Sequence, residues 1–184
     1  MDFGKLLARV QAILLTPRGE WPRIAAEAAT VQGLYTSYIA WLAAIPALCG
    51  LLAWNSASLT GLVIAYLASL AAAYIVAILI DSLAPSFGGQ RDATQAMKLV
   101  AYSSTASWVA GVGALIPLVG WMVELAGALY GVYLLYLGLP VLMRCPPERA
   151  VMYSLVIVVL TLVLFGVLGA LLGGGTVLGL GTLL

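Results

Sequence analysis

The sequence predicts an all-α, polytopic membrane protein: a bundle of five transmembrane helices preceded by a short N-terminal amphipathic region. Of the 184 residues, 64% are apolar and only 8% are charged. A soluble domain carries about 25% charged residues. No soluble domain of this length can bury so much apolar surface, whereas a lipid bilayer accepts it. The apolar stretches are each about 20 residues long, the length at which a helix crosses the hydrocarbon core.

Three regions are expected along the chain. Residues 1–31 are predicted to be a cytoplasmic amphipathic segment, residues 32–172 the five-helix membrane domain, and residues 173–184 an apolar tail interrupted by glycine. Asp92, followed by Gln95, is predicted to cap the helix that enters the third span. The five spans themselves are predicted at residues 33–54, 59–80, 98–120, 121–143 and 150–172.

The N-terminal segment has apolar residues at helical spacing, namely Phe3, Leu6, Leu7, Val10, Ile13 and Leu14. This pattern predicts a short helix that lies on the membrane surface. The alternative is a pair of cytoplasmic helices packed under the bundle with no lipid role. Thr16-Pro17 is predicted to end the first helix, and a second helix is predicted to start at Pro22, with Trp21 at headgroup level.

The positions of the basic residues predict the orientation of the bundle. All eight fall before the first span, between spans 2 and 3, or between spans 4 and 5, which places them on one side of the membrane: Lys5, Arg9, Arg18, Arg23, Arg91, Lys98, Arg144 and Arg149. The positive-inside rule makes that side cytoplasmic. The N-terminus is therefore predicted in the cytoplasm and the C-terminus in the periplasm or outside the cell.

Composition argues against several classes of function. The chain has no histidine, so it lacks the commonest metal ligand and the commonest general base. It has no zinc-ligand spacing, phosphate-binding loop or dinucleotide fingerprint, and no basic surface for nucleic acid. Cys49 and Cys145 are predicted at opposite depths, which argues against a disulfide between them. No cofactor and no catalytic residue are predicted.

Two carboxylates are candidate functional residues, because ionisable groups within a membrane usually have a function. Asp81 ends the second span and could pair with Lys98 or Arg91 across its own loop. Glu124 lies about one turn inside the outer end of the fourth span. It could reach headgroup water, or it could face inward as a gate or cation contact, and the inward orientation is the hypothesis adopted here.

The third span begins with hydroxyl-bearing side chains, which could bond to the backbone or line a solute path: Tyr102, Ser103, Ser104 and Thr105. Hydroxyls in membrane helices commonly bond to a nearby carbonyl. The fourth span contains Gly127 and Gly131, a GxxxG pair typical of close helix packing. This pair could pack within one chain or join two copies.

Several segments resemble the Yip (Ypt-interacting protein) domain family. They lie in a characteristic order over roughly residues 10–165: Thr16-Pro17 to Trp21, Leu83-Ala84-Pro85-Ser86-Phe87-Gly88-Gly89, Lys98-Leu99-Val100-Ala101-Tyr102-Ser103, Leu115-Ile116-Pro117, and the run from Leu129 to Pro140. The resemblance implies five transmembrane helices and a cytoplasmic N-terminus.

The chain departs from the family pattern at two places. Ala106 stands where a proline is expected, and Gly33-Leu34-Tyr35 only partly matches the Asp-Leu-Tyr-Gly-Pro element of eukaryotic members. The role of those members in vesicle traffic with small GTPases is therefore not carried over. Residue usage is typical of bacteria, so the resemblance implies a protein of the bacterial inner membrane.

Two functional hypotheses follow. The first is a non-enzymatic, multi-pass inner-membrane protein that acts as a scaffold or partner-binding module. Its expected partners are membrane lipids and a protein or a second copy, but not nucleic acid. The alternative is a small-solute or ion transporter or channel that uses the intramembrane Glu124. A dry, packed interior between Glu124 and the third-span hydroxyls would favour the scaffold.

Overall fold

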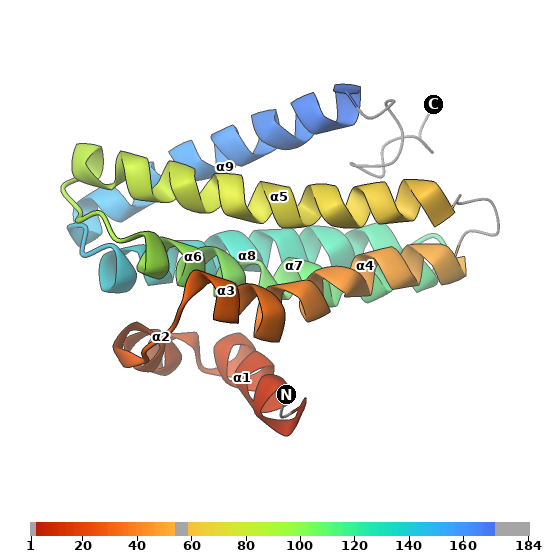
Figure 1. Cartoon of the computed structure of the whole chain (residues 1–184), viewed down its shortest axis with the longest axis horizontal. Coiled ribbons are helices and arrows are strands. Elements are labelled where there is room, and N and C mark those ends of the chain that lie inside the picture. The colour runs from red at the N-terminus through yellow and green to blue at the C-terminus, as the bar shows by residue number, and fades with distance from the viewer. Residues whose placement is uncertain (1–2, 54–58, 172–184) are drawn as a thin grey trace.

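The computed structural model describes residues 3–53 and 59–171, and within them every regular element is a helix (Figure 1). Four helical stretches in these ranges are long and apolar enough to cross a membrane: Val31–Ala53, Leu59–Phe87, Gly120–Leu142 and Pro147–Leu171. The all-α fold is thus confirmed, with four clear candidate spans where five were predicted. The connection 55–58 between the first two predicted spans, the predicted span ends at Trp54 and Leu172, and the 173–184 tail lie outside the described residues.

The N-terminal segment forms two helices, α1 (Phe3–Leu15) and α2 (Pro17–Ala26). The predicted break at Thr16-Pro17 is confirmed, but the predicted helix start at Pro22 is wrong because Pro22 lies inside α2. The carbonyl of Thr16 accepts the N–H groups of Gly19 and Glu20, both at 3.1 Å. Pro17 therefore occupies the favourable first position of the helix, and α2 starts one turn earlier than expected.

The first candidate span has three parts: α3 (Val31–Leu34), a π-helical turn η1 (Tyr35–Ile39) and α4 (Ala40–Ala53). Thr30 caps its start by accepting the N–H of Gly33 at 3.0 Å. The second candidate span, α5 (Leu59–Leu83), continues into a short 3-10 turn, η2 (Ala84–Phe87). Gly88 ends that turn with a left-handed φ of 75°, a conformation that glycine adopts without strain.

The predicted third span is not one continuous helix. It consists of α6 (Ala93–Ser103), α7 (Thr105–Ala110) and a 3-10 segment η3 (Gly111–Leu115). The predicted cap is confirmed, since Asp92 accepts the N–H groups of Thr94 and Gln95, each at 3.0 Å. The helix consequently begins at Ala93, directly after the predicted cap, and includes Lys98, where the span was predicted to start.

Close contacts and polar side chains explain the interruption. The hydroxyl of Thr105 donates to the carbonyl of Ala101 at 3.2 Å, a bond that competes with regular helix geometry. Farther along, Gly111 lies so close to Pro46 of α4 that a Cβ atom on Gly111 would be 2.7 Å from the Pro46 Cγ. The tighter 3-10 winding at Gly111 thus coincides with the point where α4 approaches most closely.

The last two helices are α8 (Gly120–Leu142) and α9 (Pro147–Leu171). We call the half of the bundle that ends at the connections 84–92 and 143–146 the basic half, and the opposite half the apolar half. On α5, α8 and α9 nearly all fully buried residues lie in the basic half: Ala72, Ala73, Val76, Ala77, Ile80, Gly131, Leu134, Leu135, Gly138, Leu139, Leu142, Ala150, Tyr153, Ser154 and Ile157. Residues 59–71 and 121–130 contain no fully buried residue. The core therefore occupies one half of the bundle.

Candidate functional site

Helices α1 and α2 lie beside the basic half of the bundle, next to α3 and α4 in the view of Figure 1. The hydroxyl of Tyr130, near the middle of α8, donates to the carbonyl of Leu14 at 2.7 Å. Trp21 is buried against α8, where a Cβ atom on Gly138 would lie 2.9 Å from its ring. Trp21 is thus not the headgroup anchor that was predicted.

The apolar stripe of α1 faces the protein rather than lipid. Leu6, Val10 and Ile13 are buried in the core, and Leu14 is partly buried against it. Leu7 is half-exposed and Leu15 is 79% exposed on the outside of the pair. The helical periodicity was therefore predicted correctly, but the stripe packs on the bundle, as in the alternative of two packed helices. The pair lies beside the bundle, however, and not under it.

A cluster of charged residues joins the pair to the bundle. We call it the charged junction, and it consists of Arg9, Glu20, Glu27, Lys98 and Tyr102. The guanidinium of Arg9 forms ion pairs with the carboxylates of Glu20 and Glu27, and its Cζ lies 5.9 Å from the centre of the Tyr102 ring, a cation–π distance. Burial by itself lowers the pKa of Arg9, but the hydrogen bond to Glu27 and the charges of Glu27, Tyr102 and Glu20 together outweigh it and raise the pKa above its ordinary value.

Lys98 connects α6 to the end of α2. Its side chain is buried, with the residue only 2% exposed, and its ammonium donates to the carbonyls of Ile24 at 2.8 Å, Ala25 at 3.4 Å and Glu27 at 2.6 Å. Carbonyls at a helix C-terminus lack partners within the helix and carry partial negative charge. Lys98 therefore neutralises the end of α2 and holds it against α6.

The predicted pairing of Asp81 is resolved by the same contacts. Because Lys98 is directed at α2, Asp81 does not pair with it. Asp81 pairs instead with Arg91, the other partner considered, with Arg91 Nη2 and Asp81 Oδ2 separated by 3.2 Å. Arg91 is largely exposed, so this pair contributes little stability.

Of the four hydroxyl-bearing residues of the third predicted span, Tyr102, Ser103 and Thr105 are buried, and the hydroxyls of Ser103 and Thr105 are bonded to neighbouring groups. Ser103 donates to the carbonyl of Val100 at 3.3 Å, and Thr105, besides its bond to Ala101, shares a 2.8 Å hydrogen bond with the hydroxyl of Tyr38. The rings of Tyr38 and Tyr102 are in contact, with centroids 4.7 Å apart. Ser104 is only partly buried and occupies the turn between α6 and α7. Of the two roles considered for these hydroxyls, local bonding is the one seen.

Glu124 is exposed on α8 in the apolar half, so the inward orientation is wrong for this structure. A Cβ atom on Gly113 would lie 3.4 Å from the Glu124 Cγ, which places Glu124 beside η3 and away from the buried hydroxyls. The physical reason is that residues 121–130 of α8 have too few neighbours to bury any side chain fully. The structure thus brings Lys98, Tyr102, Ser103 and Thr105 together and leaves Glu124 and Asp81 apart from them.

The two glycines of the GxxxG pair face α6 and α7 of the same chain. A Cβ atom on Gly127 would lie 2.2 Å from the Cβ of Ala110, and one on Gly131 would lie 3.1 Å from the carbonyl oxygen of Ser103. Both glycines therefore permit close backbone approach within one chain, the first of the two roles considered.

Arg9, Glu20 and Glu27 are site residues that the sequence did not predict, because N-terminal charges by themselves indicate only topology. Glu20 is only 5% exposed. One pattern in the sequence could have indicated this cluster: the apolar stripe of residues 3–14 is accompanied by acidic as well as basic residues. A helix that lies on a membrane surface needs no acidic partner for its arginine, whereas a helix packed on protein does. Chemically, the charged junction can hold the N-terminal helices against α6, or it can present a charged surface to a binding partner. Within the described residues, no three His, Cys, Asp or Glu side chains are placed to hold a metal ion.

Comparison with known proteins agrees with this architecture. The model of the Yip1 domain matches residues 12–168. The chain is 28% identical to inner membrane protein YohC of Escherichia coli K12 over 167 residues, covering 80% of this chain and 85% of the relative. The YohC protein of E. coli O6:H1 strain CFT073 matches to the same extent. No solved structure matches the chain. Because the domain match covers most of the sequence, the chain belongs to the Yip1-domain family of membrane proteins.

Proposed function

We propose that the chain crosses the bacterial inner membrane five times, with its N-terminus in the cytoplasm and its C-terminus in the periplasm or outside the cell. Support for a fifth crossing comes from the contacts of α6, α7 and η3 with α8. Leu99 lies against Gly138 near one end of α8, and Gly113 lies against Gly120 at the other end. The interrupted run therefore follows α8 over its whole length, and Gly111 and Gly113 of its irregular segment are buried against neighbouring helices.

The orientation and location rest on charge and on similarity. Arg91, Arg144 and Arg149 lie at the basic end of the bundle, and the N-terminal basic residues lie on the helices beside that half. The positive-inside rule assigns this end to the cytoplasm. The matched relatives are named inner membrane proteins, which supports the same location here.

Within this membrane, we propose that the protein is a non-enzymatic scaffold, with the outer face of α1 and α2 as its partner-binding surface. The charged junction carries this proposal, because Arg9 pairs with Glu20 of α2 and lies over the Tyr102 ring of α6, while Lys98 of α6 holds the end of α2. A surface held in this way is preorganised, which lowers the entropy cost of binding. Exposed on it are Leu15, Arg18 and Arg23, a mixture of apolar and basic groups that suits a protein partner with an acidic rim, or a second copy.

The transporter alternative has less support. It requires Glu124 and the third-span hydroxyls to share a path, yet Glu124 lies on the surface and the hydroxyls of Ser103 and Thr105 are bonded inside the bundle. The scaffold does not need either group.

Site-specific photocrosslinking in living bacteria tests the scaffold. A photoreactive amino acid at Leu15 is expected to give discrete protein adducts, whereas the same amino acid at Leu162 of the apolar half, which is 63% exposed, is expected to give only lipid adducts. Adding Glu20→Gln should weaken the Leu15 adducts at equal protein level, because Arg9 loses a buried partner. Lipid adducts alone at Leu15 would contradict the proposal.

A further inference from the structure

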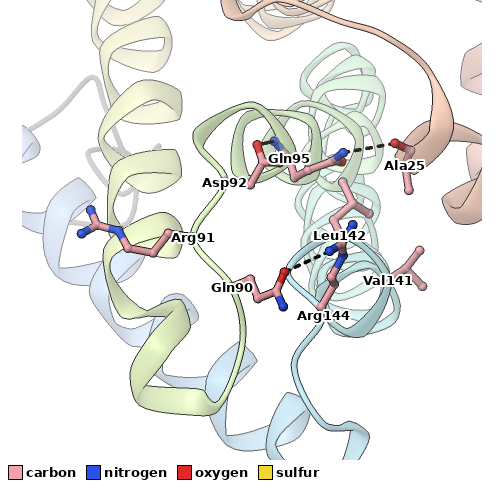
Figure 2. Close-up of a pocket in the computed structure, with 8 residues that line it drawn as sticks. All are labelled: Ala25, Gln90, Arg91, Asp92, Gln95, Val141, Leu142 and Arg144. Carbon is pink, nitrogen blue, oxygen red and sulfur yellow. Dashed lines mark hydrogen bonds between the residues drawn. The ribbon is translucent and has the colours of Figure 1, made fainter.

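A polar pocket of about 120 Å³ lies where the C-terminus of α2, the N-terminus of α6 and the C-terminus of α8 meet (Figure 2). It is separate from the charged junction, although Ala25 borders both. Its lining comes from three segments distant in sequence: Ala25, Gln90, Arg91, Asp92, Gln95, Val141, Leu142 and Arg144. Such convergence of polar groups on one small recess is typical of a binding site.

One side of the pocket supplies a cation in a constrained position. Arg144 follows the last residues of α8 with a φ of 53°, the left-handed conformation usually taken there by glycine. Its guanidinium donates to Gln90 Oε1 at 3.0 Å, which uses one of five N–H donors. The backbone at 89–90 packs closely against the end of α8. The N–H of Gln90 donates to the Met143 carbonyl at 2.8 Å, and a Cβ atom on Gly89 would lie 2.7 Å from that oxygen.

The opposite side supplies acceptors. Asp92 accepts the Thr94 and Gln95 N–H groups through Oδ1. Gln95 donates its amide to the Ala25 carbonyl at 3.1 Å, while its Oε1 is buried without a hydrogen-bond partner among the described residues. A buried acceptor left without a donor costs about 1–3 kcal/mol. Arg91 does not neutralise this side, since its side chain points away from the other lining residues (Figure 2) and pairs with Asp81.

We propose that this pocket binds the zwitterionic phosphoethanolamine headgroup of a phospholipid. The phosphate would accept from Arg144, and the ammonium would donate to Gln95 Oε1 and to the carboxylate of Asp92. One positive and one negative side chain, placed on opposite sides, match a ligand that carries both charges and disfavour a purely anionic one. The proposal does not depend on the scaffold, only on the membrane placement.

A lipid, rather than a soluble phosphate ester, is indicated by the position of the pocket. Val141 and Leu142 of α8 form its apolar border, and Val141 is exposed on the helix surface. The pocket lies at the end of a helix of 23 residues, which is about the length that spans the hydrocarbon core. The headgroup would therefore sit at the interface while its acyl chains follow α8 into the bilayer.

Two variants remove the charges and keep the backbone. Arg144→Gly retains the left-handed conformation without the guanidinium, and Asp92→Asn retains the helix cap without the charge. Arg149→Gln is the matched control, because Arg149 is exposed near the same loop but does not line the pocket. Native mass spectrometry of the purified full chain would measure binding of short-chain phosphatidylethanolamine, phosphatidylglycerol and free O-phosphoethanolamine, with thermal unfolding as the check on folding.

The parent is expected to bind phosphatidylethanolamine about tenfold more tightly than phosphatidylglycerol, and Arg144→Gly is expected to lose about tenfold of that affinity. Asp92→Asn should remove most of the preference between the two lipids, and Arg149→Gln should bind as the parent does. If Arg144→Gly does not fold, Arg144→Lys is expected to show a smaller loss in the same direction. Equal binding of both lipids by the parent, or unchanged binding in Arg144→Gly, would overturn the site. Equal affinity for free O-phosphoethanolamine would overturn the lipid source.

Discussion

The two halves of the bundle use different means to hold the same helices together. In the basic half, α6 packs against α5 and α8, and α9 packs against the same two helices. Large residues such as Tyr153 and Leu134 are fully buried there. In the apolar half, the backbones of α8 and η3 approach each other directly, since a Cβ atom on Gly120 would lie 2.0 Å from the Gly113 carbonyl oxygen. The difference indicates that the basic half has a core of its own, whereas the apolar half depends on lipid for most of its side-chain contacts.

The halves differ in their polar groups as well. In the basic half, buried polar groups such as the Lys98 ammonium and the Tyr153 hydroxyl have backbone carbonyl partners, Ile24 and Ile80 among them. In the apolar half, Glu124 is exposed. Unsatisfied polar groups cost several kcal/mol in an apolar medium. Specific contacts, and with them candidate function, are therefore concentrated in the basic half.

The largest expected effect comes from placing a leucine at a glycine in each half. A Cβ atom on Gly138 would lie 2.5 Å from Leu99 Cδ1 and 2.9 Å from the Trp21 ring, whereas one on Gly166 would have nothing within 4 Å. Gly138→Leu is therefore expected to lower the free energy of unfolding by about 3 kcal/mol or more, and Gly166→Leu by less than about 0.5 kcal/mol. Thermal unfolding in detergent measures both, and equal losses would abolish the distinction between the halves.

A smaller effect is expected where α2 meets the bundle. Lys98→Met removes the ammonium that donates hydrogen bonds to the α2 carbonyls. The free energy needed to separate α1 and α2 from the bundle should therefore fall by about 1–3 kcal/mol. Hydrogen exchange in these helices should accelerate, while exchange in α9 stays unchanged. Arg18→Met, which alters an exposed basic residue of α2, is the control. Acceleration in all helices alike would show that Lys98 supports the whole core.

Labelling of cysteine thiols tests whether the basic half faces the cytoplasm, as proposed. Cys145 is buried, and burial raises the pKa of its thiol, so at neutral pH it has less thiolate than a free cysteine. Maleimide should label Cys145 at least about tenfold more slowly than an exposed Ser86→Cys, and the rate should increase as the pH rises toward the raised pKa.

The exposed cysteine is consequently the better topology probe. In a background with Cys49→Ser and Cys145→Ser, an impermeant maleimide should leave Ser86→Cys unlabelled in intact cells and label it after permeabilisation. Labelling in intact cells would invert the proposed orientation.

The smallest effect is expected at Glu124. Because this side chain is exposed in the apolar half, Glu124→Gln should change the free energy of unfolding by less than about 0.5 kcal/mol. Added monovalent or divalent cations should stabilise neither the parent nor the variant. Cation-dependent stabilisation that the variant loses would revive the transporter hypothesis.

Local patterns in the sequence predicted the features that depend on neighbouring residues. The cap at Asp92, the break at Thr16-Pro17 and the apolar spans all follow from residue type and spacing. The interruption between α6 and η3 could not be predicted in this way, because it involves the approach of Pro46 to Gly111. A hydropathy window adds up composition and contains no information about a partner helix.

The candidate site was less predictable than the fold for the same reason. Lys98, Tyr102, Ser103 and Thr105 were identified by residue type within a span. Their partners, however, are residues of distant segments: Arg9 beside Tyr102, Tyr38 beside Thr105, and the carbonyls of α2 around Lys98. Only the folded chain brings these groups together, so residue type could suggest that Lys98 matters but not that it holds the N-terminal helices.

The charged junction has a consequence for a protein in an energised membrane. A voltage of 100 mV changes the energy of one elementary charge moved across the membrane by about 2.3 kcal/mol. Arg9 and Lys98 contribute two formal positive charges to the junction, and Glu20 and Glu27 contribute two negative ones. The sum is zero, so the electric field does no net work when these groups move as one unit. This balance holds only while the junction is closed, because Lys98 belongs to α6 and would stay with the bundle if α1 and α2 moved away.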